Sequence, residues 1–271
     1  MIRFLILAGY FELTMYLQLS GKLNQYINLH YSYLAYISMF LSFVLALVQL
    51  IIWVKQMKIH SHLSGFWAKV ASIFLLCIPL FVGLFFPTVT LDSQTVSAKG
   101  YHFPVAAGSS KEIQQDEGTT TQYLKPDTSS YFTKSAYESE MKQAAKKYVD
   151  KKVIQVTTEN YMEVMEVIYD YPDQFAGKTI ELTGFVYNDP NNKDSQFLFR
   201  FGIIHCIADS GVYGLLTTDA PQHFENNTWI HAKGTLSIEY HKQLKQSLPV
   251  LHISDCQTIT KPDNPYVYRV F

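Results

Sequence analysis

The segment YSYLAYISMFLSFVLALVQLIIWV, residues 31–54, decides the fold class of this chain because it holds no charged side chain. A helix needs about 20 apolar residues to cross the roughly 30 Å hydrocarbon core of a bilayer, and this run is longer. The whole-chain averages, a formal net charge of −1 and a mean hydropathy of +0.02, conceal it. The segment therefore predicts a membrane-spanning helix.

Two further apolar runs flank this segment. Residues 70–87 are uncharged, and residues 4–19 are interrupted only by Glu12. No small-x-small cleavage site follows the first run, so a retained membrane helix is favoured over a cleaved signal peptide. The first 88 residues are therefore predicted to form three transmembrane helices, at about 2–20, 31–54 and 68–87.

Lysine residues predict the orientation of these helices. The segment between the second and third helices carries Lys55, Lys58 and Lys69, whereas residues 21–30 carry only Lys22. Loops rich in Lys and Arg stay on the cytoplasmic side. We therefore expect a plasma-membrane protein with a cytoplasmic N-terminus and an extracytoplasmic C-terminal domain.

The composition changes after the third apolar run. Residues 89–130 are rich in Ser, Thr, Gly and Gln and are predicted to be a polar linker. Residues 131–271 are predicted to form the extracytoplasmic domain, which begins with two helices. The first covers 135–150, and the second begins at Thr157 or Thr158 and ends before Pro172.

From Gly177 onward, apolar and polar residues alternate, which is typical of strands. Five strands are predicted, separated by turns rich in Asn, Asp, Pro and Gly: 178–187, 196–206, 212–218, 228–239 and 250–260. Gly184 and Gly234 lie inside two of them, and glycine within a strand often marks a bend or a bulge. The pattern favours an OB-like five-stranded barrel over about 177–261, with an open β-sandwich as the alternative.

Charge and motifs exclude several functions. Residues 151–271 hold 10 Lys and Arg and 14 Asp and Glu, a net charge of 10 − 14 = −4, so no basic groove for nucleic acid is expected. The chain also lacks the Gly-x-Ser-x-Gly, Walker, His-Glu-x-x-His and Cys-x-x-Cys patterns of common enzymes and redox proteins. We therefore do not expect an enzyme.

The densest reactive cluster is His205, Cys206 and Asp209, at the end of the second predicted strand. These side chains are zinc ligand types, and His252 and Cys256 on the last strand would complete a site. Neighbouring residues in a strand point to opposite faces, however, which separates His205 from Cys206. A structural role is therefore favoured, with Cys206 packed and Asp209 capping the turn. A Cys206–Cys256 disulfide is a third interpretation.

Four polar residues lie within the predicted membrane helices. Glu12 is near the middle of the first helix, where a charged side chain usually faces a bundle interior or a transport pathway. Ser38, Ser42 and Gln49 fall within about 40° of one another on the second helix at 100° per residue. Such a polar stripe suits contact with another helix. The pattern is typical of a docking subunit; interhelical hydrogen bonds without a functional role are the alternative.

Taken together, several segments resemble the YcgQ-like family of predicted permease subunits of Gram-positive bacteria, over the whole chain. They are 86–93 (FPTVTLDS), 175–186 (FAGKTIELTGFV), 200–209 and 262–268 (PDNPYVY). The family's Cys-Cys-x-Ala-Asp motif is His205-Cys206-Ile-Ala-Asp209 here, so one thiol is replaced. Some relatives carry a His-rich segment where this chain has only His60 and His62.

The resemblance implies a partner, a larger multi-helix permease subunit, and a link to zinc homeostasis. We therefore expect an accessory subunit of a two-component permease complex, embedded in membrane lipid, whose outer domain receives or gates the substrate. Two alternatives remain: a stand-alone membrane-tethered zinc-binding protein, and a membrane-anchored enzyme with an unrecognised site.

Overall fold

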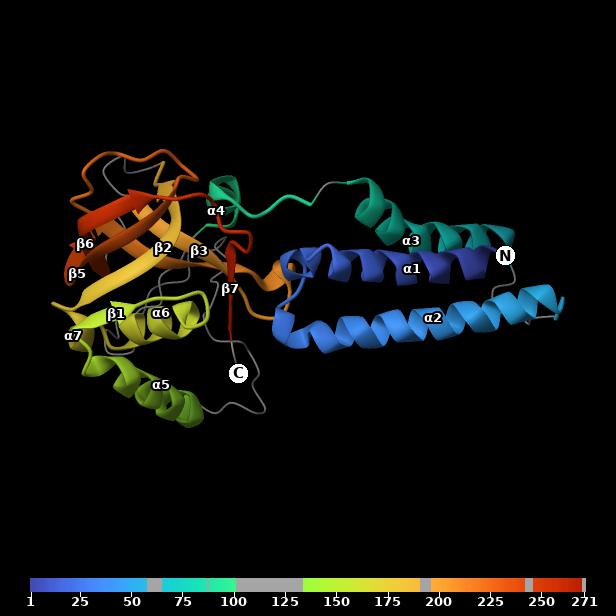
Figure 1. Cartoon of the computed structure of the whole chain (residues 1–271), viewed down its shortest axis with the longest axis horizontal. Coiled ribbons are helices and arrows are strands. Elements are labelled where there is room, and N and C mark those ends of the chain that lie inside the picture. Colours follow the sequence, from blue (N-terminus) through green and yellow to red (C-terminus); the bar gives the residue numbers. More distant parts are fainter. Residues whose placement is uncertain (58–64, 87, 101–133, 191–195, 242–245, 270–271) are drawn as a thin grey trace. The chain divides into compact units, whose positions relative to one another are not determined.

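The computed structural model describes residues 1–57, 65–86, 88–100, 134–190, 196–241 and 246–269, and the chain divides into two compact units (Figure 1). The helical unit is Met1–Thr90, and the β unit is Leu91–Phe271.

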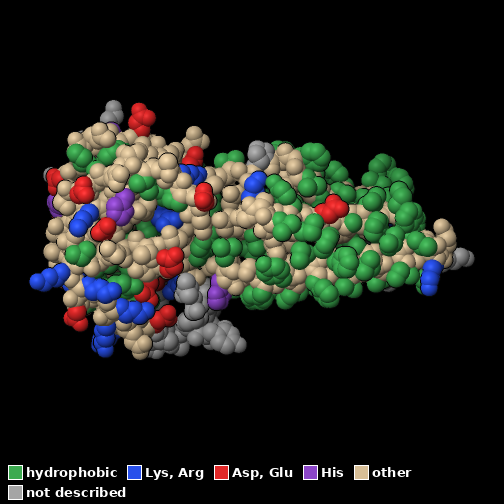
Figure 2. Space-filling view, viewed as in Figure 1, with side chains coloured by type: hydrophobic (Ala, Val, Ile, Leu, Met, Phe, Trp, Pro, Cys, Tyr) green, Lys and Arg blue, Asp and Glu red, His purple; other side chains and the backbone are tan. Residues whose placement is uncertain are grey.

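Three apolar helices form the helical unit, as predicted: α1 (Ile2–Leu19), α2 (Ser32–Val54) and α3 (Phe66–Phe85). All three are long and apolar enough to cross a membrane. Two short 3₁₀ helices, η1 (Lys22–Gln25) and η2 (Leu29–Tyr31), connect α1 to α2. Figure 2 shows that hydrophobic side chains cover most of the visible face of this unit.

Helix α1 packs against both other helices. On the α3 side, glycines allow close approach: a Cβ atom on Gly9 would lie 3.0 Å from Leu80, and one on Gly83 would lie 2.9 Å from Leu13. On the α2 side, the rings of Phe11 and Phe43 are 5.3 Å apart. Small residues at helix contacts are typical of membrane bundles.

The β unit is built on five longer strands at the places where the alternating pattern predicts them. They are β2 (Thr179–Asn188), β3 (Gln196–Ile203), β4 (Gly211–Thr218), β5 (Trp229–His241) and β6 (Gln246–Thr258). Two additional strands, β1 (Val153–Gln155) and β7 (Tyr266–Tyr268), extend the sheet. Three residues are too few to show alternation in the sequence, so these were not predicted.

The pairings of the five longer strands return to their starting point. Strand β2 pairs with β3, β3 with β4, β4 with β6, β6 with β5, and β5 again with β2. Only the β4–β6 pairing is parallel. A register shift lies between Lys233 and Gly234, and a Cβ atom on Gly184 would lie 2.7 Å from the backbone oxygen of Phe199. Gly234 thus lies at an irregular strand pairing, and Gly184 lies at a close contact between two strands.

Two hydrophobic clusters cover the two faces of these strands. The first joins residues such as Ile180, Leu198 and Leu215 to α6 (Tyr161–Asp170). The second is aromatic, with the rings of Phe197 and Phe199 stacked 5.2 Å apart and those of Phe185 and Phe201 stacked 5.5 Å apart. Alternating residues of one strand therefore enter different clusters, as period-two geometry requires.

The helices before the sheet differ in one detail from the prediction. Helix α5 (Lys134–Val149) matches its predicted bounds closely, and a short helix, α7 (Pro172–Phe175), follows α6. Helix α6, however, has Asn160 as its N-cap instead of Thr157 or Thr158. The Asn160 side chain accepts a hydrogen bond from the Thr157 N–H at 2.7 Å, so a turn precedes the helix and delays its start.

The start of the predicted linker also differs, because residues after Leu91 pack on the sheet. Helix α4 (Ser93–Lys99) is capped by Asp92, whose carboxylate accepts hydrogen bonds from the N–H groups of Gln94 and Thr95. Val96 is only 1% exposed within the aromatic cluster. The polar composition of this segment gives no sign that Val96 would be buried. Residues 101–130 of the predicted linker lie outside the described part of the chain.

Candidate functional site

Glu12 is exposed on a stripe of α1 that neither neighbouring helix covers. The stripe consists of Leu5, Glu12, Tyr16 and Leu19, spaced by seven, four and three residues and therefore on one helix face. Glu12 forms no hydrogen bond or ion pair with any residue that the structure describes. An unpaired carboxylate on an apolar helix is the chemical feature of this unit that most requires an explanation.

The three polar residues of α2 have different surroundings. Ser42 is half-buried, four residues before Ala46, which is 6% exposed and is the buried residue of α2. Ser38 is exposed. Gln49 lines a cleft of about 910 Å³ that α1, α2 and α3 form together. The predicted polar stripe is thus divided between a half-buried position, an exposed position and a cavity.

His205, Cys206 and Asp209 lie together around η3 (Ile207–Asp209), immediately after β3. The Asp209 carboxylate accepts hydrogen bonds from the backbone N–H groups of His205 and Cys206, at 2.9 and 3.0 Å. It also lies 2.8 Å from the His205 Nδ1 atom. Asp209 therefore caps the turn and holds the imidazole beside it.

His252 and Cys256 have other partners. The imidazole of His252 lies 2.6 Å from both the Asp219 and the Glu239 carboxylates. The hydrogen bond to Asp219 raises the pKa of His252 above its usual value. Burial acts in the opposite direction, and the hydrogen bond to Glu239 raises the pKa further. Cys256 is partly buried against the first cluster. The contacts of His252 with Asp219 and Glu239 could not be predicted from the sequence, because only the pairing of the strands brings these residues together.

The structure gives the predicted metal cluster no additional support. Cys77, Cys206 and Cys256 are all free thiols. Within the described ranges, no group of three or more His, Cys, Asp or Glu side chains could hold a metal ion. His60 and His62 lie outside those ranges.

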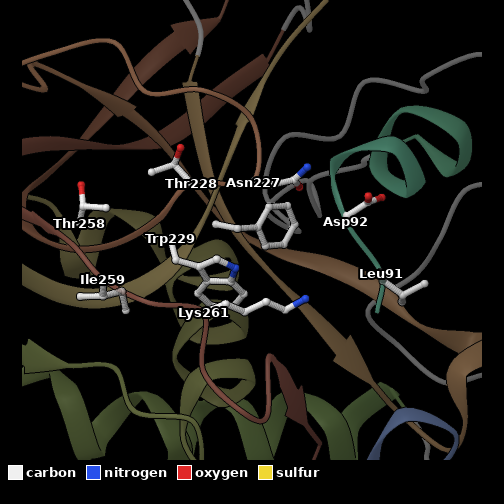
Figure 3. A pocket seen from close by; sticks show the side chains of 9 residues that line it. Leu91, Asp92, Asn227, Thr228, Trp229, Thr258, Ile259 and Lys261 are labelled. Atoms are coloured by element: carbon white, nitrogen blue, oxygen red, sulfur yellow. The ribbon is translucent and has the colours of Figure 1, made fainter. Parts of the chain in front are cut away.

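A small pocket of about 340 Å³ opens in the β unit, where the segment before α4 meets β2, β5 and the end of β6. Figure 3 shows the ring of Trp229 in this pocket, with Asp92 and Leu91 on the side of α4. Its lining combines two aromatic rings with hydroxyl, amide and charged groups, from Leu91, Asp92, Phe185, Asn227, Thr228, Trp229, Thr258, Ile259 and Lys261. Such a lining suits a small polar molecule with one apolar face.

Arg200 supports this pocket from the interior. It is 3% exposed, and its guanidinium lies 5.8 Å from the centre of the Trp229 ring. The same group donates hydrogen bonds to the backbone oxygens of Asn264, Pro265 and Tyr266. Arg200 therefore ties the C-terminal segment to the sheet and packs beside the ring of Trp229. A lone arginine in a strand gives no sequence signal of this role.

Two domain models of one family match this chain in succession. The DUF1980 N-terminal domain matches residues 2–102, and the DUF1980 C-terminal domain matches residues 131–269. The chain belongs to the DUF1980 family. The N-terminal domain model covers the helical unit together with α4. The C-terminal domain model covers the rest of the β unit.

Two full-length relatives of this DUF1980 protein have been named. One, from Streptococcus mutans serotype c, is 67% identical over all 271 residues and is called a "Putative two-component membrane permease complex subunit". The other, UPF0703 protein YcgQ of Bacillus subtilis strain 168, is 40% identical over 292 aligned positions, again covering both chains completely. The resemblance to the YcgQ-like family is thereby confirmed. The first relative's name and the three apolar helices both indicate a membrane location.

Proposed function

We propose that this chain is the accessory subunit of a two-component permease complex in the plasma membrane and docks on a larger multi-helix subunit. The observation that carries the proposal is the exposed, unpaired carboxylate of Glu12 on the uncovered stripe of α1. The name of the 67% identical relative supports the same role.

Glu12 lies near the middle of α1 (Ile2–Leu19), where a membrane helix is surrounded by hydrocarbon. A charged side chain at the centre of a membrane helix costs about 2.5–3.5 kcal/mol on insertion scales. A partner helix that supplies a cation or a hydrogen-bond donor would remove much of this cost. Leu5, Tyr16 and Leu19 on the same stripe provide the apolar surface for such a helix. Membrane lipid would cover the remaining apolar faces.

Copurification with the partner tests the docking role. The tagged full-length chain, extracted from native membranes in mild detergent, should recover a multi-helix membrane protein, and Glu12→Leu should lower that recovery at least tenfold. Leucine favours membrane insertion, so a loss would not reflect failed insertion. Glu225→Gln, which changes an exposed carboxylate of the β unit, is the control. Unchanged recovery with Glu12→Leu would contradict the proposal.

For the β unit, we infer that the closed ring of five strand pairings is an OB-like barrel outside the cytoplasm. The order of its pairings and its single parallel pair support this inference. We further infer that the pocket at Trp229 receives or gates the transported substrate, since its aromatic and polar lining suits a small molecule. The net charge of −4 over 151–271 disfavours nucleic acid as a partner.

The orientation has its own test. A thiol introduced at the exposed Ser254 position should react with an impermeant reagent on intact cells, whereas one at Gln56 should react only after permeabilisation. A variant with Cys77, Cys206 and Cys256 replaced by serine provides the background. The reverse labelling pattern would overturn the orientation. A stand-alone zinc-binding protein and an unrecognised enzyme are weaker alternatives, and neither explains the exposed Glu12.

A further inference from the structure

The helical unit contains a second feature that docking does not explain, which is the cleft of about 910 Å³. The first turns of α1, the last turns of α2 and the first turns of α3 enclose it. Its volume falls within the roughly 300–1,000 Å³ of small-molecule sites. The cleft is large enough for a polar head group and part of the chains attached to it.

The cleft carries positive charge without a counter-charge. Arg3 and Lys69 both line it, and none of the described residues that line it is acidic. Neither cation forms an ion pair with any residue that the structure describes. Before Asp92, the sequence contains one acidic residue, Glu12. The two cations are therefore free to bind an anion from outside the chain.

The remaining lining distinguishes between kinds of anion. Ile6, Ile52, Ile73 and Leu76 provide apolar walls, while Tyr10, Gln49 and Ser72 add hydrogen-bonding groups. A small inorganic anion would leave these apolar walls without a partner. An anionic amphiphile would satisfy both parts of the cleft. Arg3 and Lys69 lie in the first turns of their helices, at the depth where lipid head groups meet a membrane helix.

We propose that this cleft binds one anionic glycerophospholipid, with its phosphate between Arg3 and Lys69. The cleft and the Glu12 stripe use different faces of α1. At 100° per residue, four of the cleft-lining positions of α1 (3, 6, 7 and 10) point roughly opposite to the stripe positions (5, 12, 16 and 19); Ile2, at the start of the helix, also lines the cleft. The lipid and a docked partner can therefore bind together. This inference requires the helices to span a membrane, and it does not depend on the permease role.

Lipid binding to the purified full-length chain in detergent tests the proposal. Native mass spectrometry should show dioleoylphosphatidylglycerol bound about tenfold more tightly than dioleoylphosphatidylcholine, which has the same acyl chains. The double variant Arg3→Gln, Lys69→Gln should abolish this preference, because each cation near a lipid phosphate contributes substantially to binding. The double variant Lys22→Gln, Lys55→Gln removes the same charge outside the cleft and should retain the preference.

Three results would overturn the proposal. They are equal binding of the two lipids to the wild type, equal loss of preference in both double variants, and displacement of the lipid by millimolar inorganic phosphate. The last result would show a simple anion site. Glu12→Leu should bind phosphatidylglycerol as the wild type does, which separates a failure of this proposal from a failure of the docking proposal.

Discussion

The two units of this protein solve the problem of burying apolar surface in different ways. Among the described residues of the helical unit, only Ile6, Asn28 and Ala46 are buried, although the three helices are strongly apolar. The β unit instead buries two extensive clusters within itself, and even its polar Arg200 and Glu166 are only 3% exposed. The helical unit thus leaves most of its apolar surface uncovered by its own residues, whereas the β unit supplies its own core.

Separating the two units tests this contrast and should give the largest effect. A fragment of residues 91–271 should be soluble without detergent and unfold cooperatively, because both hydrophobic clusters lie within it. Residues 1–90 should aggregate in water, since their apolar helix faces would be exposed. Circular dichroism melts and sedimentation measure both outcomes.

A shorter fragment sharpens the same test. Residues 131–271 lack α4 and its buried Val96, so the aromatic cluster would be partly uncovered. We expect this fragment to melt at a lower temperature than residues 91–271. Equal melting temperatures would show that α4 does not contribute to the self-sufficient core of the β unit.

A smaller effect is expected from a single change in that core. Gly184→Val should lower the free energy of unfolding of residues 91–271 by about 3 kcal/mol, because even a Cβ atom would lie 2.7 Å from the Phe199 backbone oxygen. Urea denaturation measures the loss. Thr235→Val, on an exposed position of β5, is the control and should change stability by less than about 0.5 kcal/mol. Similar values for the two variants would argue against a close strand contact at Gly184.

The smallest effect concerns the buried Glu166, whose carboxylate lies 3.3 Å from Arg269. Burial raises the pKa of Glu166 from 4.5 to about 7, although Arg269 opposes the shift. The unfolded chain therefore loses this proton at lower pH than the folded chain. The group consequently lowers the stability of residues 91–271 as the pH rises from about 4.5 to about 7.

Glu166→Gln should reduce this fall in stability by on the order of 2 kcal/mol between pH 4.5 and 8. Urea denaturation across that range measures the change, with Glu225→Gln as the exposed control. The same pH dependence in the wild type and in Glu166→Gln would show that Glu166 titrates normally.

Local patterns predicted most of the elements. The three apolar helices and five strands depend on hydrophobic periods that are visible within one segment. The start of α6 and the packing of α4 were harder to predict, because they depend on Asn160 bonding back to Thr157 and on Val96 reaching a distant aromatic cluster. Strands β1 and β7 form only because longer strands present edges to them.

The candidate sites show the same division. The sequence alone identified Glu12 as an unusual charge, but the packing of α2 and α3 on α1 decided that its stripe stays uncovered. It grouped His252 with Cys206, whereas strand pairing placed His252 between Asp219 and Glu239. Periodicity and charge act over a few neighbouring residues and can be read from the chain. Which side chains meet depends on strand order and helix packing, and only the tertiary structure decides these.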